Sequence, residues 1–281
     1  MRLGFHLSIA GSLRRALSEA EKLGCEALQI FVQNPRTWRW RPVPAAEIRQ
    51  FVAARRQLGV WPLVVHLTYL PNLAARDPRL SQLSRERFYQ ELALARDLEA
   101  DYLVAHPGHG PLEEETFRRA AQTLAWAIAR IGPPPLVLLE NTAGQGLEIG
   151  YRPAQLRRLL DLSGVPLGLC LDTAHAYGAG YDLGTAFGVN RLLADIARGP
   201  GLERLKILHL NDSRATLASR VDRHWHLGQG AIGVEGLRQF LSHPWLSVEA
   251  AIMETPKKPA AADWYNLLVA RSLMAGAALL R

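Results

Sequence analysis

The feature that most constrains the fold is a regular alternation of short apolar runs with longer amphipathic segments along the 281-residue chain. Residues 62–67 (PLVVHL) are one such run, and residues 112–132 form a segment whose apolar residues recur with a helical period. Near-continuous apolar runs are typical of parallel strands buried on both faces of a sheet. Eight strands, each followed by a helix, predict an α/β fold of the closed (β/α)8, or TIM-barrel, type.

The predicted strands are residues 3–9, 27–32, 62–67, 102–108, 135–142, 166–173, 205–212 and 248–256. The clearest predicted helices are residues 12–24, 81–100, 112–132, 153–164 and 262–280. No linker or low-complexity tract divides the chain, so residues 1–281 are predicted to form a single domain. No glycine-rich phosphate fingerprint follows the first strand, which argues against a dinucleotide-binding fold.

The composition of the chain indicates where the protein is located and what kind of partner it binds. The chain has no signal peptide pattern and no apolar run of about 18 residues, so we expect a cytoplasmic protein without a membrane partner. Cys25 and Cys170 both lie in apolar stretches and are expected to be reduced core thiols. The formal net charge of +7 favours an anionic partner such as nucleic acid.

Polar side chains recur where the predicted strands end. In a TIM barrel these carboxyl ends surround a single mouth, where active sites are built. The long segments 33–44 (QNPRTWRWRPVP) and 213–232 lie at the same end, and long loops in compact domains are commonly functional. The candidate residues at this mouth are His66, His106, Glu140, Asp172, His175, His209, Asp222, His224 and Glu254.

Nine such groups cannot lie together without partners, because like charges and desolvation both oppose it. Divalent cations remove that difficulty, and mixed imidazole and carboxylate donors suit Zn²⁺, with Mn²⁺ or Fe²⁺ as alternatives. The number of donors predicts two or three ions with a bridging carboxylate. A glycosidase pair made of Glu140 and Glu254 is disfavoured by the five histidines, and no G-x-S-x-G nucleophile motif is present. His6 is expected to be a core histidine with no second polar strand-end group beside it, and His109 and His226 are expected to be neighbours of the stronger candidates.

Several segments together resemble one known family. They are ENTAGQG (140–146), GLCLDTAHAYGAGYDL (168–183), LKILHLNDS (205–213) and SRVDRHWHLGQGAIG (219–233), supported by HLTYLPNLA (66–74), VAHPG (104–108) and METP (253–256). The chain resembles the endonuclease IV family of apurinic/apyrimidinic endonucleases, which have a TIM barrel of the xylose-isomerase-like superfamily. Two positions depart from the family pattern: Ala174 often is Cys, and Trp225 often is a second His.

The resemblance implies a metal-dependent phosphodiesterase of the deoxyribonuclease IV type that acts in base excision repair on double-stranded DNA containing abasic sites. Hydrolysis 5′ to the site would leave a 3′-hydroxyl and a 5′-deoxyribose phosphate, and 3′-blocking groups would also be removed. Glu140 would be catalytic, and Arg36, Tyr69 and Leu70 would contact the distorted DNA. The family also suggests a monomer without an obligate protein partner.

The family pattern further implies three ions, mostly zinc. His66, His106 and Glu140 would hold the first; Glu140, Asp172, His209 and Glu254 the second; and His175, Asp222 and His224 the third.

Two other functions remain open. A sugar isomerase or epimerase on a related barrel would share Glu140, Asp172, His209 and Glu254, which hold one divalent ion. The five remaining donors distinguish the two enzyme classes, because they supply further ion sites. A non-catalytic DNA-binding module would not explain a complete ligand set at a barrel mouth.

Overall fold

A closed barrel of eight parallel strands forms the centre of the computed structural model, which describes residues 1–276. Its order is β1-β10-β7-β6-β5-β4-β3-β2, so neighbours in the chain are neighbours in the barrel, and β1 closes it by pairing with β10. All eight predicted strands are confirmed. They are β1 (Arg2–Leu7), β2 (Ala27–Ile30), β3 (Leu63–His66), β4 (Tyr102–Ala105), β5 (Leu136–Glu140), β6 (Gly168–Asp172), β7 (Leu205–His209) and β10 (Ala250–Met253).

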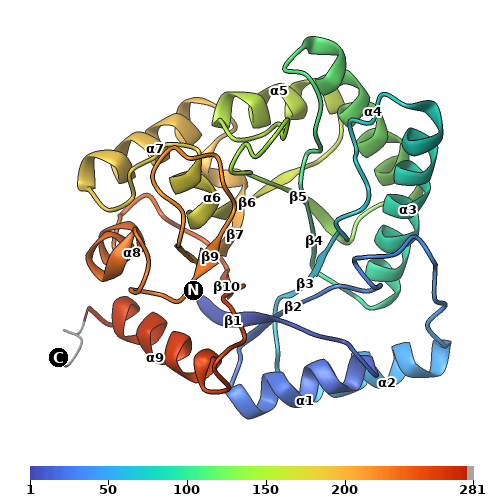
Figure 1. Ribbon diagram of the computed structural model, residues 1–281. Coiled ribbons are helices and arrows are strands. Elements are labelled where there is room, and N and C mark those ends of the chain that lie inside the picture. The colour runs from blue at the N-terminus through green and yellow to red at the C-terminus, as the bar shows by residue number, and fades with distance from the viewer. Residues whose placement is uncertain (277–281) are drawn as a thin grey trace.

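Helices surround the barrel as an outer ring (Figure 1). The five predicted helices are confirmed within the described residues, although residues 277–280 of the last prediction lie outside them. The helix predicted at residues 81–100 begins earlier, because Pro78 occupies its first turn and the Asp77 side chain accepts a hydrogen bond from Leu80 N. The helices are α1 (Leu13–Leu23), α2 (Ala45–Leu58), α3 (Pro78–Asp97), α4 (Glu114–Ile131), α5 (Pro153–Ser163), α6 (Thr173–Gly178), α7 (Ala186–Arg198), the 3-10 turn η1 (Leu202–Arg204), α8 (Gly233–Leu241) and α9 (Ala262–Met274).

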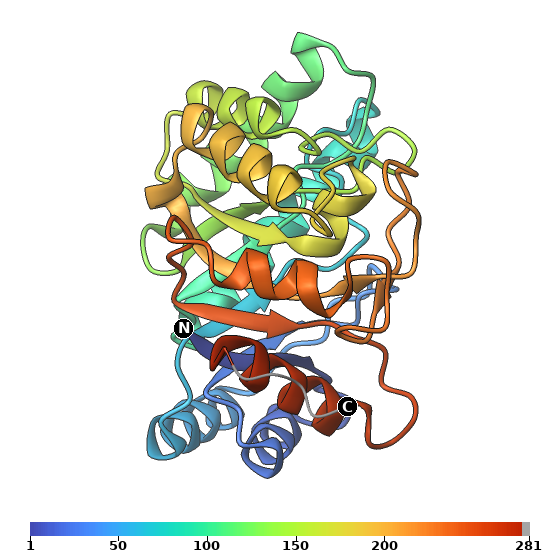
Figure 2. The same ribbon diagram turned by 90° about the vertical axis from the view of Figure 1, so that its left-hand side faces the viewer.

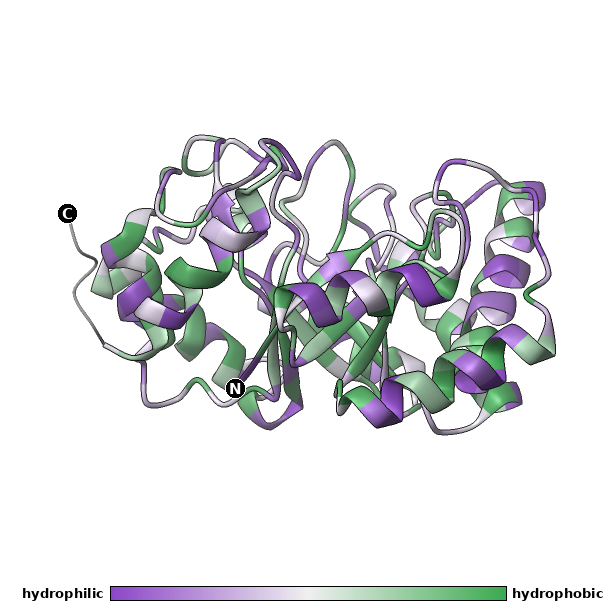
Figure 3. Cartoon of the chain, turned by 90° about the horizontal axis from the view of Figure 1, so that it is seen from below, coloured by the Kyte–Doolittle hydropathy of each residue, from purple (hydrophilic) through white to green (hydrophobic). Residues whose placement is uncertain are grey.

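The apolar core has two layers, because successive strand residues point alternately into the barrel and out to the helices. Val64, Val104 and Ile207 belong to the buried cluster inside the barrel, whereas Leu63 and Leu103 belong to the cluster packed against the helices. The barrel strands are accordingly mostly apolar along their length, while the helices carry both polar and apolar residues (Figure 3). Cys25 and Cys170 are both buried and unpaired, as expected of core thiols.

Register brings the polar strand ends to one level. His66 pairs with Val104, Glu140 with Cys170, and Asp172 with His209 in the parallel ladders. Because parallel strands end on the same side, their carboxyl-terminal side chains share one face of the barrel.

The long loops lie beyond these carboxyl ends (Figure 2). Segment 31–44 joins β2 to α2, and segment 67–77 joins β3 to α3. Segment 210–232 joins β7 to α8 and contains a short antiparallel ribbon of β8 (Asp212–Ser213) and β9 (His224–Trp225). Among residues 1–276, no helix has both the length and the apolar character needed to span a bilayer.

Candidate metal centre

The structure brings eight of the nine predicted donors into three overlapping groups at the barrel mouth, and the ninth, Asp222, lies beside the third group, in which Asp172 takes its predicted place. Within each group, one donor atom per residue lies within 4.8 Å of every other donor atom. The groups identified in residues 1–276 are His66, His106 and Glu140; Glu140, Asp172, His209 and Glu254; and Asp172, His175 and His224.

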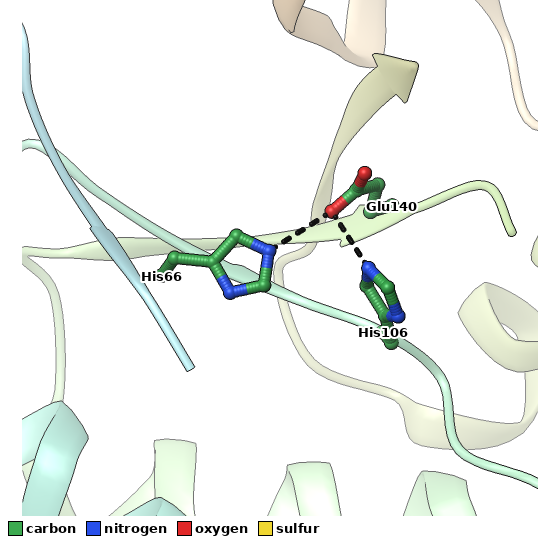
Figure 4. A group of neighbouring side chains, drawn as sticks. All are labelled: His66, His106 and Glu140. Carbon is green, nitrogen blue, oxygen red and sulfur yellow. Dashed lines mark hydrogen bonds and ion pairs between the residues drawn. The ribbon is translucent and has the colours of Figure 1, made fainter. Parts of the chain in front are cut away.

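The first group joins the ends of β3, β4 and β5. Oε2 of Glu140 lies 3.2 Å from Nε2 of His66 and 3.1 Å from Nε2 of His106. Both imidazole rings point at this carboxylate (Figure 4). Glu140 is fully buried at the end of β5, and its other oxygen, Oε1, contacts His175 and His209 instead.

The second group contacts Oε1 of Glu140. Nδ1 of His209 lies 3.0 Å from Oε1 of Glu140, 3.3 Å from Oε2 of Glu254 and 3.9 Å from Oδ2 of Asp172. Glu140 therefore faces two groups with two different oxygens, which is the arrangement expected of a bridging carboxylate.

The third group depends on the long loop between β7 and α8. Asp222 lies with Oδ2 3.2 Å from Nε2 of His175 and with Oδ1 3.3 Å from Nε2 of His224. Nε2 of His224 also lies 3.4 Å from Oδ2 of Asp172, the carboxylate shared with the second group. The predicted donors Asp222 and His224 therefore do reach the mouth, although they lie 50 and 52 residues beyond Asp172 in the sequence.

Hydrogen bonds on the outer side of the rings fix the imidazole tautomers. Nδ1 of His66 lies 2.7 Å from the carbonyl oxygen of Leu67, and Nδ1 of His175 lies 2.8 Å from that of Asn141. A carbonyl oxygen can only accept, so each Nδ1 carries a hydrogen, and in the neutral ring each Nε2 then has the lone pair that a metal ion would bind.

Gln29, which is not among the predicted site residues, fixes the tautomer of His209 in the same way. Its amide nitrogen donates to Oε1 of Glu254 at 2.7 Å, which turns its oxygen toward Nε2 of His209 at 2.8 Å. Nε2 of His209 therefore carries the hydrogen and Nδ1 faces the carboxylates. The available signal was a glutamine inside the apolar run ALQIFV, because an unpaired polar side chain in a buried strand is costly.

The expectation for His6 is wrong in one respect. It was predicted to be a core histidine without a polar strand-end neighbour, yet its Nδ1 lies 3.0 Å from Oε1 of Glu254 and 3.0 Å from Nε2 of Gln29. The reason is barrel closure, because β1 pairs with both β2 and β10 and so carries His6 between them. His109 is exposed, and His226 is buried against Asn266.

Neighbouring asparagine side chains hold the Asp172 carboxylate and its backbone. The Asn211 amide donates to Oδ2 of Asp172 at 2.7 Å, and its oxygen accepts from the backbone N–H of Glu254 at 2.9 Å. The Asn141 side chain bonds both the N–H and the carbonyl of Asp172. These contacts hold the carboxylate of Asp172 and the backbone of Glu254 in place before any ion binds.

Electrostatics in the cluster favour a bound cation. Burial opposes ionisation of Glu140, but His209 and His106 hold the pKa of its carboxyl well below the usual value. Burial disfavours protonated His175, but Asp172 and Asp222 raise its pKa well above the usual value. The metal-free protein therefore balances buried carboxylates with protons on imidazoles.

A divalent cation would supply that positive charge and leave the imidazole lone pairs free to bind it. Nε2 of His224 is buried and makes no well-directed hydrogen bond among the described residues, although carboxylate oxygens of Asp172 and Asp222 lie 3.4 and 3.3 Å away, as expected of a nitrogen that shares an ion with them. The donor set of histidines and carboxylates therefore fits divalent cations of the zinc type.

The residues predicted to contact DNA lie on the loops that surround this cluster. Tyr69 is 67% exposed and its ring packs edge-on against Phe31, with the centroids 5.1 Å apart. Arg36 is exposed and Leu70 is half-buried. All three residues lie beyond the carboxyl ends of β2 and β3, on the same side of the barrel as the donor groups.

Comparison with known proteins agrees with this geometry. The family model described as "Xylose isomerase-like TIM barrel" matches residues 17–268, which confirms the predicted fold. Endonuclease 4 of Thermus thermophilus is 43% identical over 274 residues, which cover 96% of this chain and 97% of that protein.

Among solved structures, endonuclease IV from another strain of Thermus thermophilus matches with a TM-score of 0.88 and 41% identity, covering 99% of this chain and all of that one. A D-tagatose 3-epimerase-like protein matches with a TM-score of 0.74 but only 19% identity, over 98% of this chain and 97% of that one, which shows a shared fold alone.

Proposed function

The chain belongs to the endonuclease IV family of xylose isomerase-like TIM barrels, and on that premise we propose that it cleaves double-stranded DNA on the 5′ side of abasic sites. Membership of this family makes it an endonuclease; the abasic substrate and the point of cleavage are the proposal. The observation that carries it is the set of donors beyond the four that an epimerase would also use. His66, His106, His175, Asp222 and His224 all lie within ion-pair distance of a partner in the cluster.

We propose that the cluster holds three divalent cations, with zinc as the principal metal and Mn²⁺ as an alternative. When bound, such ions polarise phosphoryl oxygens, lower the pKa of water and neutralise a departing alkoxide. The proposed ligands are His66, His106 and Glu140 for the first ion; Glu140, Asp172, His209 and Glu254 for the second; and His175, Asp222 and His224 for the third.

Glu140 is the proposed catalytic carboxylate because it touches the two groups between which the scissile phosphate would lie. A carboxyl whose pKa is held well below its usual value is a weak proton acceptor. Its role in this proposal is therefore to remain ionised and to orient the attacking water, rather than to store the proton. Burial of Glu140 excludes bulk water that would screen its charge.

The mouth loops are proposed to recognise the damage. An abasic nucleotide lacks stacking on one strand, so it is the easiest nucleotide to extrude from the duplex. Arg36, Tyr69 and Leu70 would fill the resulting gap from the minor groove, as wedging side chains do in other DNA-bending proteins. The exposed ring of Tyr69 suits this role because insertion would bury its apolar surface.

The products would be a 3′-hydroxyl and a 5′-deoxyribose phosphate, and blocked 3′ ends would be accepted as well. We further propose that residues 1–281 act as one domain, as a monomer in the cytoplasm and without an obligate protein partner. The buried free thiols of Cys25 and Cys170 are consistent with a reducing compartment.

One experiment separates the proposed nuclease from the epimerase alternative. A labelled duplex with one central abasic site, the same duplex undamaged, and a set of ketoses are each incubated with zinc-loaded protein. We expect a single nick 5′ to the abasic site, loss of the nick after chelation, and recovery on adding zinc. Turnover of a ketose without nicking would instead support the epimerase, and binding of the abasic duplex without a nick would support a DNA-binding module.

A further inference from the structure

A buried ion pair on α3 lies outside the metal cluster and has no part in the chemistry described above. Glu91 is fully buried, although carboxylates are rarely buried without a specific partner. Its carboxylate accepts a hydrogen bond from the backbone N–H of Thr68 at 3.1 Å and a second from the Thr68 hydroxyl. Thr68 directly precedes Tyr69 and Leu70, so Glu91 fixes the base of that loop.

The partner of Glu91 reaches the other DNA-contact loop. Arg87 is one helical turn earlier on α3, is 3% exposed, and has Nη1 3.7 Å from Oε1 of Glu91. Its Nη2 donates to the carbonyl oxygen of Thr37 at 3.1 Å, and Thr37 directly follows Arg36. The same guanidinium lies over the ring of Trp40, 5.4 Å from its centroid.

The energetics indicate why such a pair would be retained. Burial raises the pKa of Glu91 to about 7, against the opposing effect of the Thr68 hydrogen bonds and Arg87. The charge is thus costly to keep in the interior, and a buried ion pair commonly adds no stability over an apolar pair of similar volume. What an apolar pair could not do is bond two separate loop backbones at defined points, which Arg87 and Glu91 do together.

We propose that Arg87 and Glu91 form a buried clamp that holds the 31–44 loop and the 67–77 loop in the relative position needed to engage a damaged site. The proposal rests on the DNA-repair function proposed above. It assigns Arg87 and Glu91 as positioning residues, because both side chains are buried and their hydrogen bonds go to Thr37 and Thr68 rather than to a predicted metal ligand. Their effect reaches the substrate through Arg36 on one loop and through Tyr69 and Leu70 on the other.

The test measures binding and chemistry separately in Arg87→Met and Glu91→Gln. Affinity for abasic and undamaged duplex is measured by anisotropy in a chelator, and cleavage by single-turnover assays at saturating zinc-loaded protein. We expect affinity for the abasic duplex to fall about tenfold or more, as misplacement of binding groups commonly causes. The single-turnover rate should stay within about twofold of the parent and zinc content should be unchanged, because the cluster is not altered.

Arg55→Met provides a matched control. Arg55 of α2 is also buried, lies 3.6 Å from a carboxylate oxygen of Asp101 and donates to the carbonyl of Glu99, but at the opposite end of the barrel. This variant should lose stability without losing affinity for the abasic duplex. Thr68→Val, which removes only the hydroxyl contact to Glu91, serves if Arg87→Met fails to fold.

Two outcomes would overturn the clamp. One is an unchanged affinity for abasic duplex in all three variants, Glu91→Gln, Arg87→Met and Thr68→Val. The other is a loss of affinity in these variants that is no larger than the loss in Arg55→Met. If the parent protein does not nick abasic duplex, the proposed function is contradicted instead. That result is obtained with the parent protein before any variant is made.

Discussion

Replacement of Asp212 by Asn should release the loop that carries Asp222 and His224. Asp212 is fully buried in β8, and its carboxylate accepts five backbone N–H groups from around this loop. Oδ1 bonds Ser213 at 2.8 Å and Ile232 at 3.0 Å, while Oδ2 bonds Gly228 at 3.0 Å, Gly230 at 3.0 Å and Gly233 at 3.3 Å.

The structure sets the size of the effect. Asparagine offers one oxygen, so at least two of the five N–H groups lose their acceptor and face an amide NH₂ instead. A buried donor left without a partner costs about 1–3 kcal/mol, which predicts a loss of about 2–6 kcal/mol in the free energy of unfolding for two such groups. The loop cannot easily adjust, because even a Cβ at Gly230 would come within 2.4 Å of Oδ1 of Asp212.

The assay compares urea unfolding and zinc content in the parent, Asp212→Asn and Asp182→Asn. Asp182 is a suitable control because its side chain accepts one backbone N–H within residues 1–276, from Gly184 at 3.1 Å, which asparagine can retain. Asp212→Asn should lose stability and also release zinc to a chelator more readily, since two predicted ligands of the third ion are on the freed loop. Stability within about 0.5 kcal/mol of the parent, with full zinc retention, would refute the reasoning.

Four further predictions concern the donor groups and the loops around them. Gln29→Ala should weaken zinc retention by about 10–100-fold in a chelator competition, because the His209 tautomer is no longer fixed; unaltered retention would contradict this. His209→Ala should abolish cleavage of abasic duplex while circular dichroism shows an intact fold, and normal turnover with verified metal content would remove His209 from the site. Arg36→Ala and Tyr69→Ala should weaken binding of abasic duplex more than they slow bound-state cleavage, so equal binding in a gel-shift titration would count against both. In the metal-free protein, neighbouring carboxylates hold the pKa of His175 well above its usual 6.5. The stability that protonated His175 contributes is therefore present below pH 6.5 and is lost as the pH rises through the raised pKa. Urea titrations should show this loss without zinc but not with saturating zinc, and a gain in apoprotein stability over that pH range would contradict the prediction.

The strands and most of the candidate cluster could be predicted from the sequence because both depend on local patterns. An apolar run marks a buried strand, and a polar residue at its end lies at the mouth once the barrel closes. His6 was misjudged because its neighbour Glu254 is 248 residues away, and only the pairing of β1 with β10 brings them together.

The sequence also does not predict which charged pairs on helices are buried. Arg87 and Glu91 are four residues apart, as are Arg157 and Asp161, and the sequence gives no reason to treat the pairs differently. The first pair is buried beneath two loops, whereas the second is on the surface, where such a pair contributes little. The difference arises from which helix face packs under the 31–44 and 67–77 loops, and that is decided by tertiary structure.

Some candidate site residues are held by the barrel strands and others by the loops at its mouth. Glu140, Asp172, His209 and Glu254 lie at or next to strand ends, so the barrel strands bring their backbones to the mouth, where Gln29 and Asn211 hold their side chains. Asp222 and His224, by contrast, lie on the loop that Asp212 anchors, and Arg36 and Tyr69 lie on the loops that the proposed clamp of α3 would hold. If this division is correct, loosening either support should impair the handling of damaged DNA before it disturbs the four central donors. Asp212→Asn should then retain metal at those four residues after it has lost the third ion, whereas simultaneous loss of all bound metal would mean that the cluster is one cooperative unit.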